Sequence, residues 1–201
     1  YSIKDVNNLQ NHFFAMMSRM KNIYRWGLMR NTRRENLSEH SLETAQIAHA
    51  LALIGNRRFG KNYNPYYAAT VAVYHDSTEI ITGDMPTPIK YYNDEIKTAY
   101  KQIETAAGKT LTDMLPEDLK SDFAAVYNPD SETKKIVKAA DKLSALIKCI
   151  EELNMGNMEF SDAKDTITKA INDMNCPEAD AFLTEFIPSF SLSLDKQRKE
   201  N

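Results

Sequence analysis

Apolar residues recur along most of this chain at helical spacing. The most regular stripe follows Pro129-Asp130-Ser131 and consists of Ile136, Ala140, Leu143, Ile147 and Ile150. Intervals of three and four residues place such side chains on one face of a helix. Segments 5–20 and 158–174 show the same amphipathic pattern. No segment alternates with the period of two that marks a β-strand. The pattern predicts an all-α chain.

Signals for helix starts and stops divide the first half of the chain. Asn36-Leu37-Ser38-Glu39 is close to a capping box, and Gly55-Asn56 offers a stop to the helix that follows it. Asn64-Pro65 places a cap residue directly before a proline at the first helical position. The following residues, 68–74, are apolar nearly all round, as in a helix buried inside a bundle.

The second half continues in the same way. Residues 93–127 predict two helices interrupted near Pro116, Gly156-Asn157 ends the long helix, and Cys176-Pro177 begins another. No internal repeat, low-complexity tract or linker divides the chain. We therefore expect one all-α domain of roughly seven to eight helices.

Composition and charge exclude several classes of protein. Six Gly and seven Pro among 201 residues are about half the usual share, which argues against turn-rich β folds and Pro/Gly-rich disorder. The longest apolar runs are five residues, far below the ~18 that a membrane span requires. A net charge of −3 gives no electrostatic footprint for a nucleic-acid polymer. Cys149 and Cys176 form no C-x-x-C pair, so we expect packed thiols and a cytoplasmic location.

Candidate metal ligands stand out against this background. His40 lies early in the helix capped by Asn36, His75-Asp76 ends the buried apolar helix, and Asp141 lies on the long helix. Two imidazoles and two carboxylates from three helices would form a divalent-metal site. Glu79 follows His75 by four residues and so projects over the same helical face.

Simpler interpretations stay open for each residue. A lone histidine in a helix, such as His40, is more often packed or capped than a ligand. The His75-Asp76 pair is common by chance, and Asp141 could pair with Lys138 or Lys142. His49 is nine residues from His40 and therefore faces the opposite side of the helix. We expect His49 and His12 to be structural.

The order His, His-Asp, Asp resembles the signature of the HD-domain metal-dependent phosphohydrolases. Within them, the chain is similar to the bacterial 5′-deoxynucleotidases of the YfbR type. The blocks that carry this similarity are 22–30, 35–41, 74–91, 139–141, 148–153 and 186–190. The resemblance spans essentially the whole chain and implies a single HD-domain helical bundle over 1–201. Its ligand-bearing core would cover about 22–155, and the protein would be a homodimer.

The resemblance also implies an activity. One divalent ion, Co²⁺ or Mn²⁺, would be held by His40, His75, Asp76 and Asp141. The reaction would be the hydrolysis of deoxyribonucleoside 5′-monophosphates to deoxynucleoside and phosphate. The residues expected to contact the substrate are Arg25, Trp26, His40, Asp76, Asp84, Met85, Pro86, Thr87 and Asp141.

Four residues would have distinct roles in such a reaction. Arg25 would orient the phosphate, since a guanidinium can hold two phosphate oxygens. Trp26 would pack near the sugar, where its bulk crowds a 2′-hydroxyl. Glu79 is the candidate general acid or water-positioning group, and Asp84 is its rival for that role.

Two other functions remain alternatives. HD proteins also hydrolyse cyclic nucleotides, nucleoside triphosphates and (p)ppGpp-like compounds, although longer phosphate chains would call for more Lys and Arg around the site. A non-catalytic interaction module with vestigial ligands is the other alternative, and the intact His and Asp positions argue against it.

Overall fold

The computed structural model describes residues 11–90 and 92–198, and within them all regular structure is helical. The only extended pairing in this part of the chain is a single bridge between Tyr24 and Asn36. The predicted all-α fold is confirmed. Residues 5–10 of the helix expected at 5–20 lie outside the described residues. Residues 11–12 are not helical, and helix α2 (Phe13–Met17) and a 3-10 segment, η1 (Ser18–Asn22), follow them.

The longer helices form the body of the molecule. Their bounds are α3 (Leu37–Arg58), α4 (Pro65–Tyr74), α7 (Asp94–Thr112), α8 (Lys120–Tyr127), α9 (Ser131–Asn154), α10 (Ser161–Asn172) and α11 (Pro177–Glu185). Shorter elements connect or extend them: α5 (Glu79–Thr82), α6 (Thr87–Lys90), α12 (Leu194–Gln197), η2 (Glu117–Leu119), η3 (Met158–Phe160) and η4 (Ile187–Ser191). The breaks near Pro116 and Gly156 and the start at Pro177 agree with the expected boundaries.

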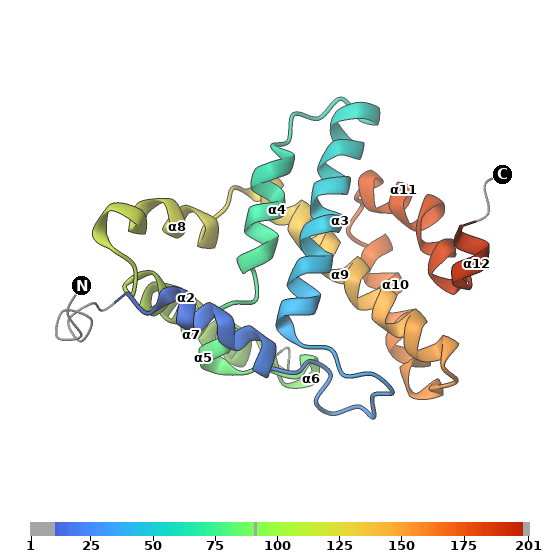
Figure 1. Ribbon diagram of the computed structural model, residues 1–201, viewed down its shortest axis with the longest axis horizontal. Coiled ribbons are helices and arrows are strands. Elements are labelled where there is room, and N and C mark those ends of the chain that lie inside the picture. The colour runs from blue at the N-terminus through green and yellow to red at the C-terminus, as the bar shows by residue number, and fades with distance from the viewer. Residues whose placement is uncertain (1–10, 91, 199–201) are drawn as a thin grey trace.

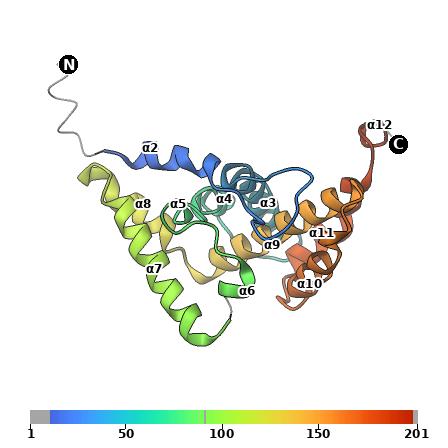
Figure 2. The same ribbon diagram turned by 90° about the horizontal axis from the view of Figure 1, so that it is seen from below.

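Helix α3 lies at the centre of the arrangement. It packs against α4, α9 and α11, and α9 also contacts α4 and α10. Figure 1 shows α4 beside α3 and α9 crossing behind it, with α2, α5, α7 and α8 on one side and α10 to α12 on the other. Figure 2 shows α7 and α10 diverging from the central helices on opposite sides. Residues near the meeting point of α3, α4 and α9 are therefore enclosed by three helices.

The start of α3 is determined by local sequence. The Asn36 side chain accepts hydrogen bonds from the backbone amides of Ser38 and Glu39, and the Glu39 carboxylate accepts one from the Asn36 amide. This reciprocal capping satisfies amides that have no partner within the helix. It places His40 one turn inside α3, facing the interior, where it is completely buried.

The expected stop at Gly55-Asn56 is wrong, because α3 continues to Arg58. A Cβ atom at position 55 would lie 2.5 Å from the ring of Tyr63. Glycine is therefore needed there for close approach of the next segment. The chain turns instead at Gly60, whose φ of 63° is the left-handed conformation that glycine adopts without strain.

Helix α4 delivers the His-Asp pair to the interior. Asn64 caps it by accepting a hydrogen bond from the Tyr67 amide, and Pro65 occupies its first position, as expected. Ala68, Val71 and Ala72 of α4 are buried. The helix ends at Tyr74, so that His75-Asp76 follows immediately, next to α3 and α9.

The main apolar core joins α3, α4, α9, α10 and α11, and Leu51, Leu143 and Ile171 are among its fully buried members. A second cluster, Phe13, Leu111 and Leu115, attaches α2 to α7. The core therefore gives the three ligand-bearing segments a packed, helical support.

In the described part of the chain, no helix combines the length and the apolarity needed to cross a membrane.

We expect Leu143→Ala to lower the free energy of unfolding by about 2–5 kcal/mol, because it leaves a cavity in this core. Urea denaturation followed by circular dichroism measures the loss. Leu194→Ala is the matched control, since Leu194 is 66% exposed and should change stability by less than ~0.5 kcal/mol. Equal effects of the two substitutions would contradict the assignment of Leu143 to the core.

Candidate active site

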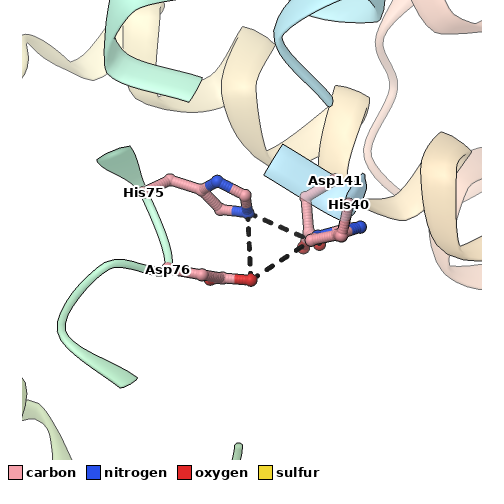
Figure 3. A group of neighbouring side chains, drawn as sticks. All are labelled: His40, His75, Asp76 and Asp141. Carbon is pink, nitrogen blue, oxygen red and sulfur yellow. Dashed lines mark hydrogen bonds and ion pairs between the residues drawn. The ribbon is translucent and has the colours of Figure 1, made fainter. Parts of the chain in front are cut away.

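Four side chains converge where α3, α4 and α9 meet. His40 comes from α3, His75 and Asp76 follow α4, and Asp141 comes from α9. Each offers one ligand atom, and these atoms all lie within 4.8 Å of one another. Figure 3 shows the two imidazoles and two carboxylates pointing toward a common point. The structure thus brings together the four residues expected to bind a metal.

The spacing of the ligand atoms suits a single cation. His40 Nε2 lies 3.1 Å from an Asp141 oxygen and 3.5 Å from an Asp76 oxygen. His75 Nε2 lies 3.3 Å from the same Asp76 oxygen and 3.9 Å from Asp141. A cation at the usual ~2.1 Å from nitrogen and oxygen ligands holds neighbouring ligand atoms roughly 3–3.5 Å apart. Three of the four distances are therefore already close to those of a coordinated site.

The hydrogen bonding of His75 provides a separate test of fit. Its Nδ1–H donates to the carbonyl oxygen of Ala72 at 2.7 Å, which turns Nε2 toward the cluster. That Nε2 atom is buried and has no hydrogen-bond partner in the described structure. A second bond of this kind orients metal-binding histidines and sets their tautomer. His75 thus presents an unsatisfied nitrogen to the cluster, and a divalent cation fits there.

The electrostatics of the cluster favour positive charge. Burial lowers the pKa of His75, but the carboxylates of Asp76 and Asp141 outweigh it and raise the pKa to about 10. Burial opposes the ionisation of the two aspartates, but their imidazole neighbours, and Arg25 beside Asp76, hold both pKa values below the usual range. The cluster therefore keeps its carboxylates ionised and attracts a cation.

Arg25 lies against the cluster. Its Nη1 donates to Asp76 at 2.9 Å, its Nη2 is 3.9 Å from Asp141, and its Nε donates to Glu35 at 3.2 Å. Burial works against the charged form of Arg25, but Asp76 and Asp141 more than compensate and raise its pKa. The guanidinium is thus held by Glu35 on one side and directed toward the cluster on the other.

Trp26 is held by the same glutamate. Its Nε1 donates to Glu35 at 3.0 Å, and its ring packs on Phe160 with centroids 5.2 Å apart. Its φ of 60° is a left-handed conformation, which costs a bulky residue of the order of 1 kcal/mol or more. Strain of this kind persists only where the surroundings enforce it. Glu35 and Phe160 are therefore part of what places Trp26.

The two candidate general acids differ in environment. Glu79 is buried, one of its carboxyl oxygens lacks a hydrogen-bond partner, and its pKa is raised to about 9 by burial and by the charges of Asp76 and Asp84. Asp84 is half-buried, and burial raises its pKa as well. Glu79 is consequently the group that holds a proton near neutral pH.

A cavity of about 460 Å³ opens beside the cluster. It is lined by Arg25, Trp26, Gly27, Leu28, Met29, Asp84, Met85, Pro86, Thr87, Pro88, Asp141, Lys142, Ala145, Asp162, Ala163, Thr166, Ile167 and Ala170. Of the expected substrate contacts, His40 and Asp76 lie in the cluster and not among these lining residues. The wall from α10 lies beyond the expected core of 22–155 and was missed, because its small and polar residues carry no motif.

The structure tests the simpler interpretations of several single residues. Asp141 makes no ion pair with Lys138 or Lys142 in the described structure and contacts His40 instead. His49 and His12 lie outside the cluster, and His49 stacks near Tyr66. Cys149 and Cys176 are free and buried, as expected of packing residues.

Sequence reasoning also missed the partners that support the site. Glu35 lies within a block similar to the family, but nothing in its spacing indicated that it holds both Arg25 and Trp26. Ser144 follows Asp141 by one helical turn, which is the only signal that could have found it. Glu43, which accepts a hydrogen bond from Ser144, has its pKa raised to about 7 by burial.

Comparison with known proteins identifies the family. The family model described as 5′-deoxynucleotidase YfbR-like matches residues 12–190. The chain belongs to the YfbR-like 5′-deoxynucleotidase family. A 5′-deoxynucleotidase of Erwinia tasmaniensis is 50% identical over 196 residues, which cover 96% of this chain and 99% of that one. One of Pectobacterium atrosepticum is 52% identical over 190 residues, 93% of this chain and 96% of that one. The predicted family and the predicted hydrolase class are confirmed.

Solved structures share the fold of this YfbR-like chain. An HD-domain phosphohydrolase from Listeria innocua has a TM-score of 0.78 at 22% identity, covering 94% of this chain and 92% of that one. The cyanophage S-2L HD phosphohydrolase DatZ, bound to dA and one catalytic Zn²⁺ ion, has a TM-score of 0.65 at 19% identity, covering 88% and 95%. These likenesses confirm the HD-domain fold.

We expect Asp141→Ala to abolish binding of a divalent cation, because it removes one of two carboxylates from the cluster. Isothermal titration with Co²⁺ or Mn²⁺ measures binding, and far-UV circular dichroism should show that helicity is retained. Asp122→Ala, at an exposed position of α8, is the control and should bind as the unaltered protein does. Undiminished binding by Asp141→Ala would exclude Asp141 as a ligand.

Proposed function

We propose that this protein hydrolyses the phosphomonoester of deoxyribonucleoside 5′-monophosphates, releasing deoxynucleoside and phosphate, with one divalent cation. The observation that carries the proposal is the His/Asp cluster at the edge of a cavity whose wall includes Arg25 and Trp26. A volume of about 460 Å³ lies in the range of small-molecule sites. The names of the 50%-identical relatives, 5′-deoxynucleotidases, support this substrate class.

Four residues would hold the cation: His40 and His75 through Nε2, and Asp76 and Asp141 through a carboxylate oxygen. A divalent cation supplies Lewis acidity there, lowering the pKa of water and offsetting charge on phosphoryl oxygens. We propose Co²⁺ or Mn²⁺ as the working ion, and the mixed nitrogen and oxygen donors suit such metals. The supporting bond from His75 Nδ1 to Ala72 keeps one of these ligands in the required tautomer.

Arg25 binds the phosphate in this proposal. Glu35 holds its Nε, so that Nη1 and Nη2 face the cluster. When a bound cation offsets the charge of Asp76 and Asp141, Nη1 and Nη2 of Arg25 can donate to two phosphate oxygens. Among the residues that line the cavity, only Arg25 and Lys142 are cationic. Few positive charges suit a monophosphate better than a triphosphate or a (p)ppGpp-like compound.

Glu79 acts as the general acid. Its carboxyl is buried and protonated at neutral pH, since its pKa is raised to about 9. It would give its proton to the 5′-oxygen as the phosphate leaves. Asp84 lines the cavity together with Met85, Pro86 and Thr87, and in this proposal it contacts the sugar.

We also propose the setting in which the protein works. Leu42, Leu53, Tyr66 and Val73 on α3 and α4 are exposed apolar residues of the kind that a homodimer interface covers. The buried free thiols suit a reducing cytoplasm. The net charge of −3 suits a single nucleotide and not a nucleic-acid polymer.

The direct test removes metal with a chelator, restores Co²⁺ or Mn²⁺, and compares phosphate release from dAMP and AMP. We expect release only with metal, and faster release from dAMP. Asp141→Ala treated in the same way is the control for contaminating phosphatase. Metal-independent release, or equal rates on the two substrates, would contradict the proposal.

Trp26→Ala should relax the preference for deoxyribose. In the proposal the indole fills the space that a 2′-hydroxyl needs, and an apolar site rejects an added hydroxyl by about 100-fold at most. We expect the ratio of kcat/KM for dAMP over AMP to fall about tenfold or more, and Trp26→Phe to retain most of it. An unchanged ratio in Trp26→Ala would show that another residue excludes ribose.

The role of Glu79 predicts a pH dependence. A general acid works in its protonated form, so kcat should fall as pH rises through the pKa of Glu79. That pKa is about 9 without a cation, and a bound cation lowers it by offsetting the charge of Asp76. We expect the alkaline limb at or below pH ~9, lost together with most activity in Glu79→Gln. If Asp84→Asn removes this limb and Glu79→Gln does not, Asp84 is the acid.

A further inference from the structure

A chain of hydrogen bonds lies behind His40, on the side away from the cluster. His40 Nδ1 is 3.0 Å from the hydroxyl oxygen of Ser144, and that hydroxyl donates to a Glu43 carboxylate oxygen at 2.6 Å. A serine hydroxyl has one proton and two lone pairs. When Glu43 is ionised, Ser144 gives its proton to that carboxylate and accepts from His40, which places the proton of His40 on Nδ1.

This arrangement leaves Nε2 of His40 with its lone pair directed at the carboxylates of Asp141 and Asp76. The other contact of that nitrogen, to the Thr44 hydroxyl, is longer, at 3.5 Å. The tautomer that a metal ligand needs is therefore set from behind, by side chains that do not reach the cluster themselves.

The residues of this hydrogen-bond chain come from α3 and α9, two helices that carry ligands. Glu43 lies three residues after His40 on α3, and Ser144 lies three residues after Asp141 on α9. Residues three apart on a helix share a face. Each ligand is thus accompanied, one turn later, by a partner that crosses the contact between α3 and α9.

The charge of Glu43 has no evident use in folding. Burial, together with the charges of Glu35 and Glu151, raises the pKa of Glu43 more than the Ser144 hydrogen bond and Arg33 lower it. A third carboxyl group next to a site that already contains Asp76 and Asp141 costs electrostatic free energy unless a cation is present. A carboxylate behind a ligating imidazole makes the ring a stronger donor toward a metal.

We propose that Glu43, acting through the hydroxyl of Ser144, is a positioning residue that keeps the proton of His40 on Nδ1 and strengthens Nε2 as a ligand for a divalent cation. The proposal rests on the metal site of the proposed function. It concerns cation binding, which is measured separately from phosphate release.

The test uses Zn²⁺ as the probe, because it is diamagnetic and binds nitrogen and oxygen ligands. Ser144→Ala keeps a small residue between α3 and α9 and removes only the hydroxyl. Glu43→Ala removes the acceptor, whereas Glu43→Gln keeps an oxygen that can accept from Ser144 but loses the charge. Isothermal titration gives Zn²⁺ affinity, and NMR of ¹⁵N-labelled protein follows the Nδ1–H signal of His40.

Ser41→Ala is the matched control. Ser41 is also buried and adjoins His40, but its hydroxyl has no hydrogen-bond partner in the described structure. We expect Ser144→Ala and Glu43→Ala to weaken Zn²⁺ binding about 10–100-fold, and Glu43→Gln to weaken it less. The His40 Nδ1–H signal should exchange faster with water in Ser144→Ala and stay protected in Ser41→Ala.

Several outcomes would overturn the proposal. Affinities of Ser144→Ala and Glu43→Ala within twofold of Ser41→Ala would do so, as would an unchanged Nδ1–H signal. A loss confined to Ser144→Ala would exclude Glu43. If Ser144→Ala does not fold, the Glu43 variants decide, since Glu43 is only half-buried. Absence of Zn²⁺ binding in the unaltered protein would remove the metal site and this proposal together. Tight binding without dAMP hydrolysis would contradict the proposed function alone.

Discussion

The structure depends on negative charge concentrated where α3, α4 and α9 meet. Asp76 and Asp141 face each other across the contact of α4 and α9, and carboxylates away from water are costly unless positive charge and hydrogen bonds satisfy them. Arg25 and the two imidazoles meet part of that requirement. The buried Nε2 atom of His75, which has no hydrogen-bond partner in the described structure, marks the position where a cation would supply the rest of the positive charge. The apolar core, which packs α3, α4 and α9 against one another, holds these charges close together.

The surrounding loops are shaped by the same requirement. Arg25 binds Asp76 of the cluster and also Glu35. Glu35 in turn accepts a hydrogen bond from Trp26, whose backbone has a left-handed conformation that costs a bulky residue free energy. A buried pair, Lys148 and Glu152, binds the backbone of the loop at Thr32 and Arg33. The helices therefore supply the ligands, and ionic contacts with them arrange the segment that would meet a substrate.

Several features were accessible to sequence reasoning because they depend on near neighbours in the chain. The caps at Asn36 and Asn64-Pro65 and the stripe of α9 were recognised from spacing, and the family blocks from their resemblance to a known family. Gly55 shows the limit of such reasoning. Gly55 looks like a helix stop in the sequence, but α3 continues past it. Glycine stands there because the ring of Tyr63, in the segment that follows α3, lies against this position. A local rule does not contain that contact.

The sequence by itself determined the helical class, the family, and the residue types from which a nitrogen and oxygen metal site is built. Periodicity and residue order carry these, since both are properties of short segments and of the chemistry of single side chains. The tertiary structure decided which nitrogen of each imidazole faces the cluster, which glutamate holds Arg25 and Trp26, and that α10 closes the cavity. These depend on distances of a few ångströms between helices far apart in the chain, and only the packing of the whole core sets those distances.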